Sequence, residues 1–281
     1  MKKNIKTAVC TISKNEDQYL LEWIEYYKSI GFDNIVFYDN NNEDNENQYK
    51  IIKPYIDNGF IKYHDFKNKH NCSQQHLAYV DCLRTYKDDF DWIAFFDVDE
   101  FLTLKEHTSI KHFLSSNNNF NNYWNIALRW VIMDDNDLIY NDKKPVLERF
   151  TRETDFQPNM KSIVNTKNVD IDFIDEYFNL HYMQMQNFNV ICNIHGEICD
   201  RSISKREKSP VVYLKHFRFK TVEECVKKIN NGDAFFSDIN KRYECIDWFF
   251  KCNKITTEKI LIIRQNFPEY DLTELIKKMK K

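Results

Sequence analysis

Glycine is scarce in this chain of 281 residues, which contains four glycines against 22 phenylalanines and 16 tyrosines. Neither GxxxxGK[ST] nor GxGxxG occurs in it. Both motifs use glycines to bring backbone N–H groups close to the phosphates of a nucleotide. The shortage argues against a glycine-rich phosphate loop, so a nucleotide would have to be held by other means.

An excess of one charge is also lacking, because 40 basic residues oppose 43 acidic residues. Such a balance does not suggest a nucleic-acid binder. No apolar run approaches the roughly 20 residues of a membrane span, and residues 8–12 are too short for a secretory leader. The eight scattered cysteines then favour a reducing compartment. We expect a cytoplasmic protein, and the basic, amphipathic segment 272–281 leaves peripheral membrane contact as an alternative.

The most informative stretch is Trp92-Ile93-Ala94-Phe95-Phe96-Asp97-Val98-Asp99-Glu100-Phe101-Leu102. Its apolar first half predicts a strand that is buried on both faces, as in a parallel sheet. Asp97, Asp99 and Glu100 then fall at the carboxyl end of that strand, where ligands bind in open α/β sheets. Three carboxylates this close repel one another, and a divalent cation is the simplest compensation.

Strand-like and helix-like segments alternate through the first hundred residues. The strand-like segments are 7–12, 34–38, 60–64 and 92–96, and helices are predicted at 19–30, 49–56 and 75–86. This order implies a mostly parallel sheet covered by helices. Ser13, Asn15 and Asp39 follow the first two strands, and a right-handed crossover places them at the same rim. Ser13 or Asn15 is also a candidate cap for the first helix.

The second half of the chain reads as strands followed by helices. Residues 123–133, 144–150, 162–164 and 211–214 are strand-like, and Thr108 is predicted to cap a short helix that ends at Leu114. Thr221 and Glu224 form a capping box for a helix at 222–230, which Gly232 would end. Further helices are predicted at 243–252, 256–267 and 272–280.

The segment from Trp92 to Leu102 carries the pattern W…F-D-x-D-E-F, and further short blocks precede and follow it along the chain. In their order these blocks resemble those of glycosyltransferase families 2 and 92. A D-x-D alone is weak, whereas the ordered series from Val9 to Gly232 makes the resemblance specific. After Trp130 the relatives usually carry Phe-Gly and this chain does not, which leaves donor and acceptor specificity open. The other matching blocks are Ser13-Lys14-Asn15-Glu16, Glu22-Trp23, Gly31-Phe32, Tyr38-Asp39-Asn40, Arg129-Trp130, Glu148-Arg149-Phe150, Lys161-Ser162-Ile163 and 216–224.

The resemblance implies a GT-A fold, which is a Rossmann-like, mostly parallel sheet flanked by helices. In that interpretation residues 1–105 bind the nucleotide-sugar, residues 106–220 bind the acceptor and complete the sheet, and residues 221–281 form a C-terminal helical region of one compact domain. It also implies Mn²⁺ or Mg²⁺ as cofactor and a UDP-sugar as donor. We expect an inverting transfer of a galactose-like hexose to a glycan, glycolipid or glycoprotein acceptor.

Two other functions stay open at this stage. One is a nucleotidyltransferase or another diphosphate-handling enzyme. Such an enzyme normally has a basic glycine-rich loop after the first strand, and Ser13-Lys14-Asn15-Glu16 is not one. The other is a catalytically inactive carbohydrate-binding protein on the same fold. The presence of the candidate metal ligands argues against it, since the chain retains Asp97, Asp99 and His216.

The resemblance also assigns candidate roles to single residues. Asp99 is expected to bind the metal most directly, Asp97 to bind the metal or the ribose, and His216 to supply a third ligand. An inverting transfer needs a general base, and Glu148, Asp155 and Glu197 are the candidates, with Glu148 first because it lies in a family-like block. Trp130 is the best candidate for stacking a sugar ring. The expected donor-binding residues are Ser13, Asn15, Glu16, Asp39, Asp97, Lys161, Arg218 and Lys220. Helix capping, core packing or a solvated surface position is the alternative for each of these residues.

Overall fold

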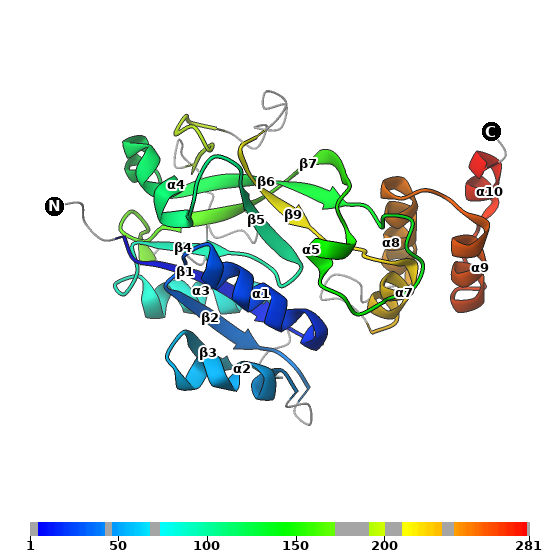
Figure 1. Ribbon diagram of the computed structural model, residues 1–281, viewed down its shortest axis with the longest axis horizontal. Coiled ribbons are helices and arrows are strands. Elements are labelled where there is room, and N and C mark those ends of the chain that lie inside the picture. The colour runs from blue at the N-terminus through cyan, green and yellow to red at the C-terminus, as the bar shows by residue number, and fades with distance from the viewer. Residues whose placement is uncertain are drawn as a thin grey trace. The chain divides into compact units, whose positions relative to one another are not determined.

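The computed structural model describes residues 5–42, 47–67, 74–171, 191–199, 210–231 and 239–279 (Figure 1). Strands and helices alternate through the first hundred residues, which confirms the predicted order. The elements are β1 (Thr7–Ser13), α1 (Asp17–Ser29), β2 (Asn34–Asp39), α2 (Asn47–Asp57), β3 (Ile61–Asp65), α3 (Gln74–Tyr86) and β4 (Trp92–Phe95).

Helix α1 forms because its apolar residues recur at helical spacing. Leu20, Trp23, Ile24 and Tyr27 are its buried residues, and positions i, i+3, i+4 and i+7 share one face of a helix. Gly31 follows the helix with φ +92°, a conformation that glycine adopts without the steric cost of a Cβ.

The strands form one sheet in the order β3-β2-β1-β4-β7-β6-β9-β5, and β8 (Ile191–Cys192) pairs with β6. Strand β1 lies parallel to β2 and β4, and β2 lies parallel to β3. Strand β7 (Glu153–Asn165) runs antiparallel to β4. The predicted α/β class, with a mostly parallel sheet flanked by helices, is confirmed, and the acidic stretch follows the fourth strand. The remaining strands are β5 (Glu100–Leu104), β6 (Asn125–Met133) and β9 (Val212–His216).

Three elements differ from their predictions. Residues 144–150 were expected to be a strand but contain helix α5 (Val146–Arg149). The prediction was wrong because a helix of four residues is too short to give a recognisable helical period of apolar residues. Residues 162–164 are the end of the 13-residue strand β7. Its full length was not predicted, because the proline at position 158 argues against a strand that continues through it. Ser109, not Thr108, caps α4 (Ile110–Ser116): its Oγ accepts a hydrogen bond from the His112 N–H at 3.1 Å. A short 3-10 helix (Asn118–Asn122) follows α4.

The chain divides into two compact units. Unit 1 comprises Met1–Val131 and Phe156–Lys215, and unit 2 comprises Ile132–Asp155 and His216–Lys281. Most of β7 belongs to unit 1 because it pairs with β4. The predicted regions 1–105, 106–220 and 221–281 are divisions by function within one domain. The functional division into a nucleotide half and an acceptor half stays a prediction.

The core of unit 1 lies between the central strands and α3. Cys10, Val36, Ile93 and Phe95 from the strands are buried together with residues of α3 such as Leu83. Each of these side chains is at most 1% exposed. This packing fixes the carboxyl ends of β1, β2 and β4, where the candidate site lies.

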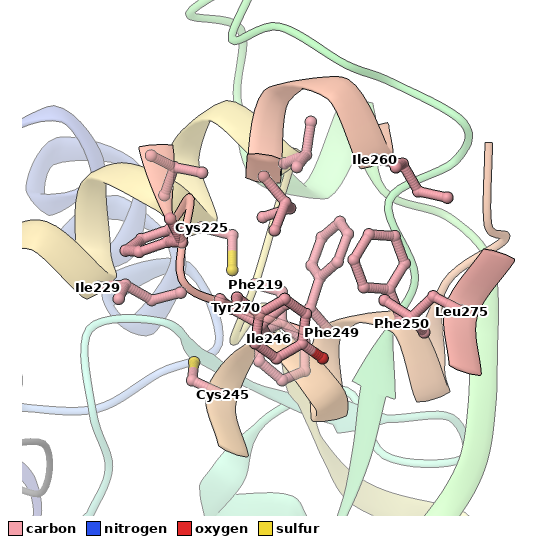
Figure 2. Close-up of a cluster of buried hydrophobic side chains, with 14 of the residues drawn as sticks. Phe219, Cys225, Ile229, Cys245, Ile246, Phe249, Phe250, Ile260, Tyr270 and Leu275 are labelled. Carbon is pink, nitrogen blue, oxygen red and sulfur yellow. The ribbon is translucent and has the colours of Figure 1, made fainter. Parts of the chain in front are cut away.

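The core of unit 2 gathers four helices, which are α7 (Val222–Asn231), α8 (Ile239–Cys252), α9 (Thr257–Asn266) and α10 (Thr273–Met279). Figure 2 shows Phe219, Ile246, Phe249 and Tyr270 meeting between them. None of the helices in the described part of the chain is both long and apolar enough to cross a membrane. The cytoplasmic location stays a prediction.

The predicted capping box begins α7. The Thr221 N–H donates to Glu224 Oε2 at 3.1 Å, and the Glu224 N–H donates to Thr221 Oγ1 at 3.2 Å. Glu224 also accepts two hydrogen bonds from the Arg149 guanidinium, at 2.8 and 3.0 Å. The arginine therefore ties α5 to the start of α7. Gly232, the predicted end of this helix, lies outside the described residues.

A second buried ion pair lies in unit 2, where Lys259 Nζ meets Asp135 Oδ2 and both side chains are 0% exposed. Lys259 Nζ also donates to the Lys254 carbonyl at 3.0 Å. A buried charge needs such partners, because desolvation of an unpaired charge is costly.

Candidate functional site

The acidic residues lie in a tight turn between two strands. Strand β4 ends at Phe95 and β5 begins at Glu100, so Asp97 and Asp99 fall between them. The Glu100 N–H donates to the Asp97 carbonyl at 3.0 Å, and the Asp97 N–H donates to Glu100 Oε2 at 2.9 Å. Asp99 is 6% exposed and Glu100 is 0% exposed. The predicted place of these acids, at the carboxyl end of a buried strand, is confirmed.

Helix α1 holds the backbone of this turn through hydrogen bonds from its buried aromatic residues. Trp23 Nε1 donates to the carbonyls of Asp97 at 3.0 Å and of Glu100 at 3.1 Å. The Tyr27 hydroxyl donates to the Glu100 carbonyl at 2.9 Å and accepts from the Leu102 N–H at 3.2 Å. Both aromatic side chains are fully buried. The acidic turn is therefore fixed by a rigid helix rather than left as an open loop.

Lys161 is the cation nearest to Asp97 and Glu100 in the described structure. Strand β7 pairs with β4 so that Ile163 is opposite Ala94, which brings Lys161 to the end of β4. Its Nζ lies 2.9 Å from Asp97 Oδ2 and 3.5 Å from Glu100 Oε2, and its side chain is 1% exposed. The sequence predicts a donor contact, to phosphate or sugar, for Lys161. The structure shows the ammonium facing carboxylates, and the ligand contact stays a prediction.

Neutral groups complete the surroundings of Asp97 and Lys161. Gln75 Nε2 and the Tyr79 hydroxyl donate to Asp97 Oδ1 at 2.6 and 3.1 Å. The ring centroids of Tyr79 and Trp130 lie 6.0 and 5.9 Å from Lys161 Nζ, within the range of cation–π attraction. Trp130 is only 3% exposed, so its ring offers little surface on which a sugar could stack.

The protonation equilibria of this cluster follow from burial and mutual charge. Burial raises the pKa of Glu100 well above its usual range; the Lys161 ammonium acts against this shift, and Asp97 and Asp99 add to it. Burial by itself would lower the pKa of Lys161, but the carboxylates of Asp97 and Glu100 outweigh it, and the pKa is raised. Lys161 therefore stays an ammonium, and the turn carries one built-in positive charge.

A second polar group lies at the ends of β1 and β2. Ser13 and Asp39 are paired in register, which confirms that the two strands end at the same rim. Asp39 is fully buried; its Oδ1 accepts from the Asn41 N–H at 3.0 Å and from Gln48 Nε2 at 3.2 Å, and its Oδ2 accepts from the Tyr63 hydroxyl at 3.1 Å. Burial raises the pKa of Asp39, although the hydrogen bonds from Asn41 and Tyr63 act in the opposite direction.

Neither predicted cap candidate caps α1. The N-cap is Glu16, with no side-chain hydrogen bond to the helix. The Ser13 hydroxyl instead donates to Gln48 Oε1, and the Asn15 N–H donates to Asn41 Oδ1 at 2.8 Å. Asn15 has φ +58°, which turns the chain away from helical geometry. Its donor-binding role, like those of Ser13, Glu16 and Asp39, stays a prediction.

Asn41 is a candidate that sequence reasoning missed. Its Nδ2 is a buried donor with no hydrogen-bond partner among the described residues. An unsatisfied buried donor is costly, and an acceptor atom of a ligand would satisfy it. The only sequence signal was its place in a polar run at the end of the second strand.

The remaining predicted residues lie mostly in unit 2. His216 ends β9 and is 3% exposed, and Lys220 is 5% exposed with φ +57°. The Arg218 guanidinium lies 4.5 Å from the centroid of the Trp248 ring. Their roles at the metal and the diphosphate stay predictions. The three candidate bases are all exposed: Glu148 has Lys144 Nζ 4.0 Å from its carboxylate, Asp155 lies on β7, and Glu197 accepts from Asn193 Nδ2 at 3.0 Å.

The donor set at the turn suits a hard divalent cation in part. Carboxylate oxygens are the ligands that Mg²⁺ and Mn²⁺ prefer, and Asp97 and Asp99 supply them. Among the described residues, no group of three or more His, Cys, Asp or Glu side chains is arranged to hold a metal. Lys161 already engages one oxygen of Asp97, and the role of Asp99 as the direct metal ligand stays a prediction. Water and ligand phosphates would complete the coordination, as is usual for Mg²⁺.

The model of one family, described as glycosyltransferase family 92, matches residues 3–243 of the chain. A glycosyltransferase family 92 protein of Ricinus communis is 28% identical over 116 residues, which are 41% of this chain and 20% of that protein. A galactan beta-1,4-galactosyltransferase of Arabidopsis thaliana is 33% identical over 75 residues, which are 25% of this chain and 14% of that protein. The chain thus spans about a fifth or less of the length of these curated relatives.

Two solved structures are also similar to the chain. An active-site mutant of LgtC has 13% sequence identity and a TM-score of 0.39, over 92% of this chain and 100% of that one. A structure of S. aureus TarS in complex with UDP has 11% identity and a TM-score of 0.40, over 96% of this chain and 75% of that one.

Proposed function

The chain belongs to glycosyltransferase family 92, and we propose that it is a metal-dependent glycosyltransferase of the GT-A fold. It would transfer a hexose from a UDP-sugar to a glycan, glycolipid or glycoprotein acceptor. The observation that carries this proposal is the acidic turn, in which Asp97 and Asp99 follow a buried central strand and are fixed by α1. Galactose is the first sugar to test, because two relatives are named galactosyltransferases.

The donor would lie along the carboxyl ends of β1, β2 and β4. Asn41 Nδ2, which is buried and has no partner among the described residues, suits an acceptor atom of the nucleoside. Ser13, Asn15 and Asp39 would shape that end of the site. Asp99 would hold the metal next to the diphosphate, and Asp97 and His216 are the other candidate ligands. When bound, the metal supplies positive charge for the leaving diphosphate.

The transfer breaks the bond between the anomeric carbon and the diphosphate oxygen and forms a bond to an acceptor hydroxyl oxygen. The proton of that hydroxyl passes to a general base. We keep Glu148 as the first candidate, followed by Asp155 and Glu197. Glu148→Gln should lower the transfer rate about 100-fold or more, as the loss of a general base does, and should leave UDP binding unchanged. Unchanged transfer in all three amide variants would rule out these carboxylates as the base.

The proposal is tested by screening nucleotide-sugars for Mn²⁺-dependent release of nucleoside diphosphate. Asp99→Asn should abolish the release. Asp57→Asn is the matched control, because Asp57 lies on α2 and its side chain is 59% exposed. If no nucleotide-sugar is hydrolysed and UDP does not bind in the presence of Mn²⁺, the proposed function is wrong.

A further inference from the structure

We propose that Lys161 is a built-in counter-cation that disfavours binding of a divalent metal to the Asp97 and Glu100 carboxylates, so that the metal depends on the donor diphosphate for further ligands. This inference rests on the proposed function, since the metal and the diphosphate belong to it. It makes Lys161 a positioning residue rather than a ligand contact. The metal site then depends on Asp99 together with the donor, and nucleotide and metal bind together.

The distances place the ammonium where a metal on these carboxylates would lie. Lys161 Nζ is 2.9 Å from Asp97 Oδ2 and 3.5 Å from Glu100 Oε2. A divalent cation binds carboxylate oxygens at about 2.0–2.6 Å. A metal bridging these two oxygens would therefore have to displace the ammonium or lie within a few ångströms of its charge. Repulsion between the two cations disfavours metal binding there.

The Lys161 ammonium is enclosed by neighbouring side chains. The side chain of Lys161 is 1% exposed, and the rings of Tyr79 and Trp130 lie within about 6 Å of its Nζ. Glu100 is fully buried, and its Oε1 has no hydrogen-bond partner among the described residues. A buried carboxylate with an unsatisfied oxygen needs a nearby positive charge, and Lys161 supplies it.

The other oxygen of Asp97 is also engaged, because Gln75 and Tyr79 both donate to Oδ1. Asp97 is therefore oriented by protein groups on both sides. Asp99, two residues further along the turn, is the direct metal ligand under the proposed function. The expected consequence is weak metal binding without nucleotide and strong binding with it.

The test measures Mn²⁺ affinity by electron paramagnetic resonance of free Mn²⁺, with and without UDP. Lys161→Met keeps the length of the apolar stem and removes the charge. We expect Lys161→Met to bind Mn²⁺ at least tenfold more tightly than wild type in the absence of UDP. Lys161→Arg keeps the charge and should behave like wild type. The double variant Lys161→Met with Glu100→Gln removes one negative charge as well and should return toward the wild-type affinity.

Lys259→Met is the matched control, because Lys259 is equally buried and paired with Asp135 in unit 2. It should lower stability and leave Mn²⁺ affinity unchanged. An affinity of Lys161→Met equal to that of wild type would overturn the inference. If Lys161→Met does not fold, Lys161→Gln, which is neutral but can still donate to Asp97, carries the same prediction and the same refutation.

The two proposals fail in different ways. Wild-type protein that binds no UDP in the presence of Mn²⁺ contradicts the proposed function, whatever Lys161→Met does. Wild-type protein whose Mn²⁺ affinity rises with UDP, together with an unaltered Lys161→Met, supports the proposed function and contradicts only the role of Lys161.

Discussion

Trp23→Phe isolates the contribution of α1 to the geometry of the acidic turn. The substitution removes one N–H that two carbonyls share, those of Asp97 at 3.0 Å and Glu100 at 3.1 Å. Each carbonyl keeps a second donor, since the Asp97 carbonyl accepts from the Glu100 N–H and the Glu100 carbonyl accepts from Tyr27. No buried acceptor is left without a partner, so we expect the lost hydrogen bonds to cost about 1–2 kcal/mol of unfolding free energy.

The loss of indole volume adds to this cost, and Trp92→Phe measures it separately. Trp92 is 3% exposed at the start of β4, at the opposite end of the strand from the acidic residues. Urea unfolding should show Trp23→Phe to be less stable than Trp92→Phe by about 1–2 kcal/mol. Tyr27→Phe should also be costly, at about 1–3 kcal/mol, because it leaves the buried Leu102 N–H without its acceptor.

The functional readout is UDP affinity in the presence of Mn²⁺. If half of the lost free energy had served to orient Asp97 and Asp99, the affinity of Trp23→Phe for UDP would fall roughly 2- to 5-fold. Trp92→Phe should bind UDP as wild type does. Equal stability of the two tryptophan variants, with equal and undiminished UDP affinity, would refute the role of α1 as the element that fixes the turn.

Two further predictions concern buried charges. Arg149→Met breaks the double hydrogen bond to Glu224, between side chains that are 1% and 7% exposed, and urea unfolding should show that the free energy of unfolding falls by about 3–5 kcal/mol. The control is Arg152→Met, which replaces a side chain that is 48% exposed and should lower the free energy of unfolding by less than about 1 kcal/mol. Equal losses in the two variants would contradict the argument. Burial raises the pKa of Asp39 above its ordinary value of 3.8, so its native state binds a proton more tightly than its unfolded state does. The stability of wild type relative to Asp39→Asn should therefore fall as pH rises from about 4 through the raised pKa, and a relative stability that rises over this range would show the sign to be wrong.

Sequence periodicity predicted the half of the fold that carries the acidic turn. The apolar residues of α1 recur at helical spacing, and the runs that became β1, β2 and β4 are continuous because helices cover both faces of a parallel sheet. Strand β5 was missed because it begins at Glu100, a residue type that is rarely fully buried without a partner. The partner, Lys161, is 61 residues further along the chain, and only the pairing of β7 with β4 brings it near.

The acids of the site could be predicted, but their partners could not. A D-x-D after an apolar run has a local signature, so Asp97 and Asp99 were placed correctly at the strand end. No local sequence signature marks the partners Gln48, Gln75 and Tyr79. Each is a polar residue on a helix, and only the fold brings it to Asp39 or Asp97. Trp23 had one usable signal. A tryptophan on a fully buried helix face needs an acceptor for its N–H, and that acceptor proved to be the acidic turn.

The central claim is that Asp99 holds a metal that binds the diphosphate of a UDP-sugar. Calorimetric titration of UDP into wild type and Asp99→Asn, each with and without Mn²⁺, tests it most directly. Wild type should bind UDP at least tenfold more tightly with Mn²⁺ than without it, and Asp99→Asn should lose that difference. Equal UDP affinity of the two proteins under both conditions would contradict the claim.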